Sequence, residues 1–226
     1  MFRKLVERIV CSDLAQNKLH AIENNTFCDF KKLEVLSLDR NNLTTIYPET
    51  ICAPNLRELH LDYNNIQLIA STSFQPLTAI KLINLDYNPI LNLPPELFKS
   101  TVKTTILRLP FNNISKIDAT AFKDLDKVAI LRLQTNNIKH VDRKAFFGLN
   151  KLKLLQLSGN PIGNFREFNL PNTASMNFLG LSRSYPLKLD ENRNRASNPV
   201  IIETLDLTNN FLSTIKNLDF GDCRTL

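Results

Sequence analysis

The chain has 226 residues, of which 43% are hydrophobic and 22% are charged, as is ordinary for a folded protein. Its formal net charge of +6 is mildly basic. Because no run of Lys and Arg accompanies this charge, it does not indicate a nucleic-acid groove. No apolar stretch reaches the roughly 18 residues that a membrane span needs, so we expect no membrane contact within this chain. The opening letters, MFRKLVERIV, carry scattered charges and do not resemble a signal peptide.

One pattern, L-x-x-L-x-L-x-x-N-x-L, recurs along nearly the whole chain. It begins at Ile9, Leu33, Leu56, Ile80, Thr104, Val128, Leu152, Met176 and Ile202. Position six is Leu in every copy, and position nine is Asn in every copy except the eighth, which has Ser184. A Phe recurs at position nineteen in most copies, from Phe27 to Phe220. Because one such unit cannot bury its apolar face alone, we predict that the copies stack into a solenoid.

Each part of the repeat predicts a local structure. The triplet L-x-L alternates apolar and polar residues, as a strand does. The Asn amide can donate and accept, so it can satisfy backbone groups where each coil turns inward, and the Phe column predicts a second apolar spine. On the returns, Pro94 and Pro95 exclude a regular helix. Residues 118–125 and 142–149 are each expected to form a short helical turn after an Asp.

These columns resemble the leucine-rich repeat family, in its 24-residue form with a Phe late in each repeat. The resemblance implies a right-handed α/β solenoid, shaped like a horseshoe, with a parallel concave sheet and a mostly irregular convex side. We expect one domain over residues 1–226, with about nine repeats starting near 9, 33, 56, 80, 104, 128, 152, 176 and 202. Without Cys-rich caps at its ends, the chain is interpreted as an uncapped fragment. The return at 188–200 is interpreted as a tolerated insertion rather than a binding loop.

Two cysteines and three sequons bear on the compartment. Cys28 and Cys52 share position twenty of adjacent repeats, so they are expected side by side. Their separation would allow a disulfide, and two small buried thiols fit the same position equally well. Asn24, Asn42 and Asn113 begin N-x-S/T sequons and are the candidate glycosylation sites. Composition alone produces about this many sequons, so their number does not fix a compartment.

The sequence carries no recognisable catalytic motif. There is no Walker, G-x-G-x-x-G or G-x-S-x-G motif, and no Cys/His cluster has zinc spacing. Of the three histidines only His60 should face the concave side, near Asp39 and Asp62. A surface His beside carboxylates is more often part of a charge pair than a catalytic base. We therefore predict that the protein is not an enzyme and expect no cofactor and no metal.

The variable positions around the strands supply the candidate binding surface. Position eight carries three consecutive aromatic residues, and position seven carries three consecutive carboxylates. Aromatic residues and Arg are enriched at interface hot spots, although these columns could equally hold ordinary solvated repeat residues. Stacked carboxylates repel, so we expect compensation by Arg40, His60 or a bound cation. The predicted partner-binding residues are Asp39, His60, Asp62, Tyr63, Asn84, Asp86, Tyr87, Arg108, Phe111 and Arg132.

The family resemblance implies recognition of a protein or other macromolecular ligand on the concave face. The 24-residue form is similar to Toll-like receptor ectodomains, insect immune repeat proteins and adhesion receptors. We therefore expect part of an extracellular or cell-surface protein in innate immunity or adhesion, with a surface that would also serve a homo- or heterodimer. The alternative is a cytoplasmic scaffold or regulator of signalling proteins, whose repeats are usually shorter. Nucleic acid is disfavoured as a ligand, because the row of Asp residues opposes phosphates.

Overall fold

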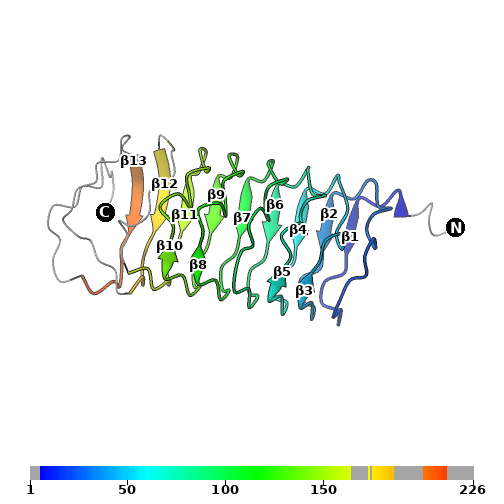
Figure 1. Cartoon of the computed structure of the whole chain (residues 1–226), viewed down its shortest axis with the longest axis horizontal. Coiled ribbons are helices and arrows are strands. Elements are labelled where there is room, and N and C mark those ends of the chain that lie inside the picture. The colour runs from blue at the N-terminus through cyan, green and yellow to red at the C-terminus, as the bar shows by residue number, and fades with distance from the viewer. Residues whose placement is uncertain (1–5, 164–172, 174, 186–200, 213–226) are drawn as a thin grey trace.

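A computed structural model of the chain describes residues 6–163, 173, 175–185 and 201–212. One long parallel sheet runs through the molecule, with its strands in chain order and its two ends far apart (Figure 1). The strands are β1 (Cys11–Asp13), β2 (Val35–Ser37), β4 (Glu58–His60), β6 (Leu82–Asn84), β7 (Ile106–Arg108), β9 (Ile130–Arg132), β11 (Leu154–Gln156), β12 (Ser175–Gly180) and β13 (Ile201–Asp206). Each of the nine strands comes from one copy of the repeat, so the predicted solenoid and its parallel sheet are confirmed.

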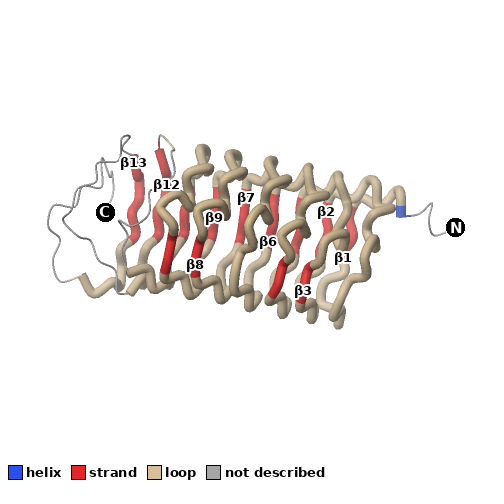
Figure 2. Tube along the Cα trace, viewed as in Figure 1, coloured by secondary structure: helices blue, strands red, loops and turns tan. Residues whose placement is uncertain are grey.

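The returns on the other side of the sheet are mostly turns (Figure 2). Two small parallel pairs interrupt them: β3 (Thr45–Ile46) with β5 (Leu68–Ile69), and β8 (Lys116–Ile117) with β10 (His140–Val141). No regular helix forms at 118–125 or 142–149, where the sequence predicts a short helical turn. Separate turns stand there, such as the one in which the Ala121 N–H donates to the Asp118 carbonyl at 3.1 Å. These returns are too short to repay the cost of nucleating a helix.

The core lies between the sheet and a spine of phenylalanines. The apolar columns at positions four and six are buried in the middle of the stack, for example Leu36 and Leu38, and Leu14 and Leu207 near its ends are partly buried. On the far side Phe98, Phe122 and their neighbours stack, with 6.2 Å between these two ring centroids. The predicted second spine is therefore present over this part of the chain, from Phe74 to Phe146.

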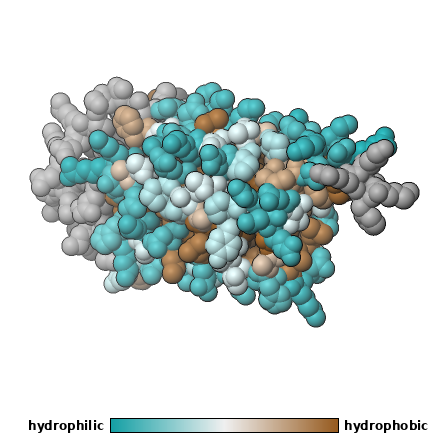
Figure 3. All heavy atoms as spheres, turned by 45° about the vertical axis from the view of Figure 1, so that its right-hand side comes forward, coloured by the Kyte–Doolittle hydropathy of each residue, from teal (hydrophilic) through white to brown (hydrophobic). Residues whose placement is uncertain are grey.

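The surface is mainly hydrophilic, with apolar atoms in separate patches, on the face that Figure 3 shows. Among the residues that the structure describes, no helix is both long and apolar enough to cross a membrane. The repeat therefore buries its apolar columns inside the stack and leaves most of the variable positions to the solvent, with Asn84 and Asp86 as buried exceptions.

The Asn column joins each coil to the one before it. Asn88 Nδ2 donates to the carbonyl oxygens of Leu61 and Leu85 at 3.0 and 3.2 Å. Its Oδ1 accepts the backbone N–H of Ile66 at 3.0 Å, so one amide satisfies buried groups of two coils. The same bridge to the preceding coil recurs at Asn41, Asn64, Asn112, Asn136, Asn160 and Asn210.

The exception in the column shows what the amide supplies. Ser184 stands where Asn would accept the backbone N–H of Ile162, and its shorter side chain does not take over this bond. The Ile162 N–H donates instead to the Asn160 carbonyl within its own turn, at 2.8 Å. Ser184 Oγ is buried and makes no hydrogen bond with the described residues. Where the Asn amide is missing, the turn is closed by a backbone hydrogen bond within one coil instead of a side-chain bond from the next coil.

Replacing Asn112 by Ala should lower the free energy of unfolding by about 3 kcal/mol. The change leaves the buried N–H of Ile90 and the carbonyl oxygens of Leu85 and Leu109 without this hydrogen-bond partner. The neighbouring Asn113 is exposed, so Asn113→Ala is the matched control and should change stability by less than about 0.5 kcal/mol. Urea unfolding followed by circular dichroism measures both. Equal losses in the two variants would contradict a structural role for the amide.

Candidate functional site

Three aromatic rings form a continuous stack just beyond the carboxyl ends of β4, β6 and β7. The centroids of Tyr63 and Tyr87 lie 4.3 Å apart, and those of Tyr87 and Phe111 lie 4.2 Å apart, with nearly parallel planes. Their residues are 41%, 39% and 39% exposed, respectively. The guanidinium of Arg40 covers the end of the stack, 4.5 Å from the Tyr63 centroid. Tyr63, Tyr87 and Phe111 are called the aromatic stack below.

The backbone of this column is left-handed. Tyr63, Tyr87 and Phe111 have φ values of 52°, 54° and 55°. The rest of the column is left-handed too: Gln16, Arg40, Thr135, Gly159, Arg183 and Asn209. The left-handed backbone conformation costs a residue with a bulky side chain about 1 to 2 kcal/mol, so this conformation alone would favour Gly or Asn. Residue type does not reveal this column, because only Gly159 and Asn209 are of the types that mark a left-handed position.

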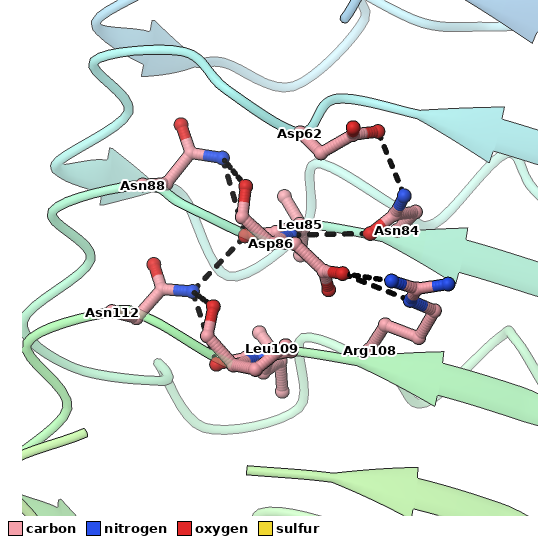
Figure 4. Close-up of polar contacts among 9 residues, drawn as sticks. Asp62, Asn84, Leu85, Asp86, Asn88, Arg108, Leu109 and Asn112 are labelled. Atoms are coloured by element: carbon pink, nitrogen blue, oxygen red, sulfur yellow. Dashed lines mark hydrogen bonds and ion pairs between the residues drawn. The ribbon is translucent and has the colours of Figure 1, made fainter. Parts of the chain in front are cut away.

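The carboxylates beside the stack are held in a polar chain that Figure 4 shows. Asp62 Oδ1 accepts a hydrogen bond from Asn84 Nδ2 at 2.7 Å. Asn84 Oδ1 in turn accepts the backbone N–H of Asp86 at 3.2 Å. Asp86 Oδ2 accepts from Arg108 through both Nε, at 3.0 Å, and Nη2. Hence Asn84 and Arg108 are the partners of this row.

Arg40 and His60, which the sequence suggested as counter-charges for the carboxylate row, contact other groups in the structure. Arg40 lies over the Tyr63 ring, and His60 Nε2 lies 3.6 Å from Glu58 Oε2 on the same strand. Burial raises the pKa of Asp62, and the nearby His60 opposes that rise only as the weakest of the contributing effects. Among the described residues, no group of three His, Cys, Asp or Glu side chains is arranged to hold a metal ion.

Burial makes the carboxylate row electrostatically unfavourable. It raises the pKa of Asp62, and the neighbouring charges of Asp39 and Asp86 raise it further. Burial also raises the pKa of Asp86, against the opposing effect of its bonds to Arg108. Asp86 is only 4% exposed, and its Oδ1 has no hydrogen-bond partner among the described residues. The fold therefore gains little from these carboxylates at neutral pH.

The remaining predicted residues extend the same surface. Arg132 on β9 lies in register with Arg108 on β7, and Asp39 is half-buried beside the row. A hollow of about 250 Å³ follows on the sheet face, lined by Arg132, Gln134, Leu154, Gln156 and Phe178. The structure thus brings the ten predicted residues onto neighbouring strands and turns, and it adds Arg40, which the sequence had suggested only as a counter-charge.

The other candidate residues lie at the N-terminal end or on exposed coil. Cys28 and Cys52 form a disulfide in the structure, with Cα atoms 4.8 Å apart. Asn24, Asn42 and Asn113 are all exposed. Cys11 in β1 is an exposed free cysteine. Cys223, Phe220 and the return at 188–200 lie outside the described residues.

The chain matches a sequence model of the leucine rich repeat over residues 13–53, 54–109 and 102–162. No curated protein matches it significantly. Among solved structures, it is similar to an LRR protein of Leptospira interrogans, with 23% identity and a TM-score of 0.67 over 83% of this chain and 46% of that one. It is also similar to a chain in the octameric complex of Latrophilin 3, Unc5D and FLRT2, which includes the FLRT2 LRR. Here the identity is 22% and the TM-score 0.62, over 76% of this chain and 61% of that one.

Asp62→Asn should raise the free energy of unfolding at neutral pH. The folded state raises the pKa of Asp62, so its ionised form costs stability above that pKa. As the pH falls through the raised pKa toward the unfolded value of 3.8, both states become protonated and the cost disappears. The advantage of the variant should therefore shrink on acidification, as measured by thermal unfolding across this range. Asp118→Asn, at an exposed carboxylate on a return, is the control; an advantage of Asp62→Asn that does not vary with pH would refute the assignment.

Proposed function

The chain belongs to the leucine-rich repeat family, and on that premise we propose that it is a non-enzymatic module that recognises a protein partner. Its repeats span residues 1–226 as one domain. The binding surface consists of the aromatic stack and the polar residues beside it: Asp39, His60, Asp62, Asn84, Asp86, Arg108 and Arg132. One observation carries the proposal: three bulky rings are held, partly exposed, at left-handed positions where the backbone favours Gly.

The physical properties of this surface suit recognition. Each ring is fixed by its neighbour at 4.2 to 4.3 Å, so little side-chain entropy remains to be lost when a partner covers it. Rigid aromatic residues flanked by charges are typical of binding hot spots. The ion pair of Asp86 with Arg108 fixes the charge pattern next to the rings, and this favours partners with complementary charges. The same surface on a second copy of the chain would serve a homodimer.

We place the module outside the cell, in an innate-immune or adhesion protein. The Cys28–Cys52 disulfide supports this, because disulfides persist in oxidising compartments. The three sequons are exposed and so could accept glycans. The similarity to a complex that contains the FLRT2 LRR shows that the fold serves multiprotein assembly in that protein. The exposed thiol of Cys11 favours the second candidate, an intracellular scaffold, since free thiols persist in reducing compartments.

The triple variant Tyr63→Ser, Tyr87→Ser, Phe111→Ser should abolish partner binding while keeping the fold. We would screen the purified chain against a panel of displayed ectodomains and measure the affinity of each hit with both proteins. A loss of at least roughly 100-fold is expected, since hot-spot aromatics each contribute about 2 kcal/mol or more. Sedimentation velocity of the same two proteins tests the homodimer.

The matched control removes exposed apolar side chains elsewhere: Tyr47→Ser, Leu68→Ser and Phe147→Ser, on the returns. This variant should keep its affinity for every hit. If it loses binding as strongly as the stack variant, or if the stack variant binds normally while folded, the aromatic stack is not the binding surface.

The compartment is tested by directing the chain through the secretory pathway with an added signal peptide. We expect glycans at Asn24, Asn42 and Asn113 and a closed Cys28–Cys52 bond, both read by mass analysis before and after deglycosylation and reduction. A reversible unfolding assay should then show a loss of about 3 kcal/mol on reduction, because the bond closes a loop of 24 residues. Free thiols at both positions in secreted material would contradict the extracellular placement.

A further inference from the structure

A groove lined by cations lies at the opposite ends of the strands from the aromatic stack. Arg57 and Lys81 immediately precede β4 and β6, and Lys32 and Lys103 lie three residues before β2 and β7. With Lys31 they line a groove of about 480 Å³, which is completed by Val10, Glu34, Asn55 and Ala79. Neither the sequence motifs nor the proposed partner surface accounts for this concentration of charge.

Backbone hydrogen bonds fix the spacing of these cations. The N–H of Arg57 donates to the Glu34 carbonyl at 2.7 Å, and the N–H of Lys81 donates to the Arg57 carbonyl at 2.8 Å. Residues in this column are therefore one strand apart, about 4.8 Å. From β2 to β7 the groove crosses three such steps, or about 14 Å along the solenoid axis. It is an elongated strip and not a closed pocket.

Most of the positive charge in the groove is uncompensated. Its lining holds five cations and one carboxylate, Glu34, which pairs with Arg57 at 3.3 Å. Lys31 Nζ donates to the Cys28 carbonyl at 2.8 Å, a bond that leaves its charge in place. Lys32, Lys81 and Lys103 are exposed and make no ion pair with the described residues. The groove thus holds much of the chain's net charge of +6, at a cost in mutual repulsion that the fold does not require.

The strip continues along the same edge of the sheet. Lys127 and Lys151 lie three residues before β9 and β11, as Lys103 does before β7. Lys153 immediately precedes β11, as Lys81 does β6, and its Nζ bonds to Ser175 Oγ at 3.0 Å. Asp126 directly precedes Lys127 in the sequence and lowers the net charge of this part of the strip. The basic rim, defined as these lysines together with the groove, therefore runs from β2 to β11.

We propose that the basic rim binds a sulfated glycosaminoglycan, with its sulfates and carboxylates placed along the lysines. A linear polyanion matches an elongated strip whose cations repeat at every strand or two. Lysines are flexible point charges, so they adapt to sulfates at variable positions without the bidentate geometry of Arg. The groove lining contains no aromatic side chain on which a nucleic-acid base could stack. The choice of a sulfated glycan over other polyanions rests on the extracellular placement proposed above.

The test titrates the full 226-residue chain with a size-fractionated heparin oligosaccharide at several salt concentrations. The variant Lys32→Gln, Lys81→Gln, Lys103→Gln should bind at least roughly ten-fold more weakly, and the slope of log affinity against log salt should fall by up to about three. The matched control, Lys116→Gln, Lys139→Gln, Lys144→Gln, removes the same charge from the returns and should change affinity by less than about two-fold. Circular dichroism and urea unfolding verify that both variants fold.

Three outcomes would overturn the proposal. Equal losses of heparin affinity in the two lysine variants would mean that binding depends on the net charge of the protein and not on the basic rim. Equally tight binding of chemically desulfated heparin would exclude sulfate recognition. Tighter binding of duplex DNA or polyglutamate of matched charge would assign the rim to another polyanion. The stack variant with Tyr63, Tyr87 and Phe111 replaced should keep its heparin affinity, so failure of this proposal and failure of the partner surface are distinguishable.

Discussion

The Asn column is the constraint on which the rest of the structure depends. A solenoid coil turns its backbone inward after each strand, and the buried N–H and C=O groups of that turn need partners. One amide meets this need in two coils at once, as Asn88 does for Leu61, Leu85 and Ile66. The flanking Leu positions must then face the core. Most positions before and after them are at least partly open to the solvent, and there the repeat leaves the choice of residue open.

The same turn sets the conformation of the aromatic stack. Closing the coil onto the next Asn places position eight in the left-handed region in every described copy. Bulky residues there carry a backbone cost, which ring stacking offsets only in part, at about 0.5 to 1.5 kcal/mol for each pair. The carboxylates at position seven add a further cost through burial. Two unfavourable columns on the same coils are hard to explain by stability, and this is why recognition is the better account.

The repeat register makes the core columns predictable from the sequence. The side-chain pairs and the basic rim are not predictable in this way, because they depend on contacts between residues far apart in the chain. Columns that recur, such as Leu38 and Asn88, could be assigned to the core from their periodicity. The pairing of Asp86 with Arg108 could not, because neither column keeps one residue type in every copy and the partner is chosen by side-chain reach across strands. The basic rim was missed for another reason. Most of its cations are about one repeat apart in sequence and form no run, yet stacking places those on adjacent strands, such as Arg57 and Lys81, about 4.8 Å apart.

The direction of a parallel sheet keeps the two surfaces apart. Every strand starts at the same edge, so Arg57 and Lys81 gather at one edge, while Tyr63 and Tyr87 gather at the other. Arg57 and Tyr63 lie six residues apart, on either side of β4, so at most about 20 Å of chain separates them. The carboxylate row at Asp62 and Asp86 lies on the stack side of the strands and repels polyanions. A sulfated polymer held on the basic rim would therefore be kept off the aromatic stack, which stays open to a protein partner.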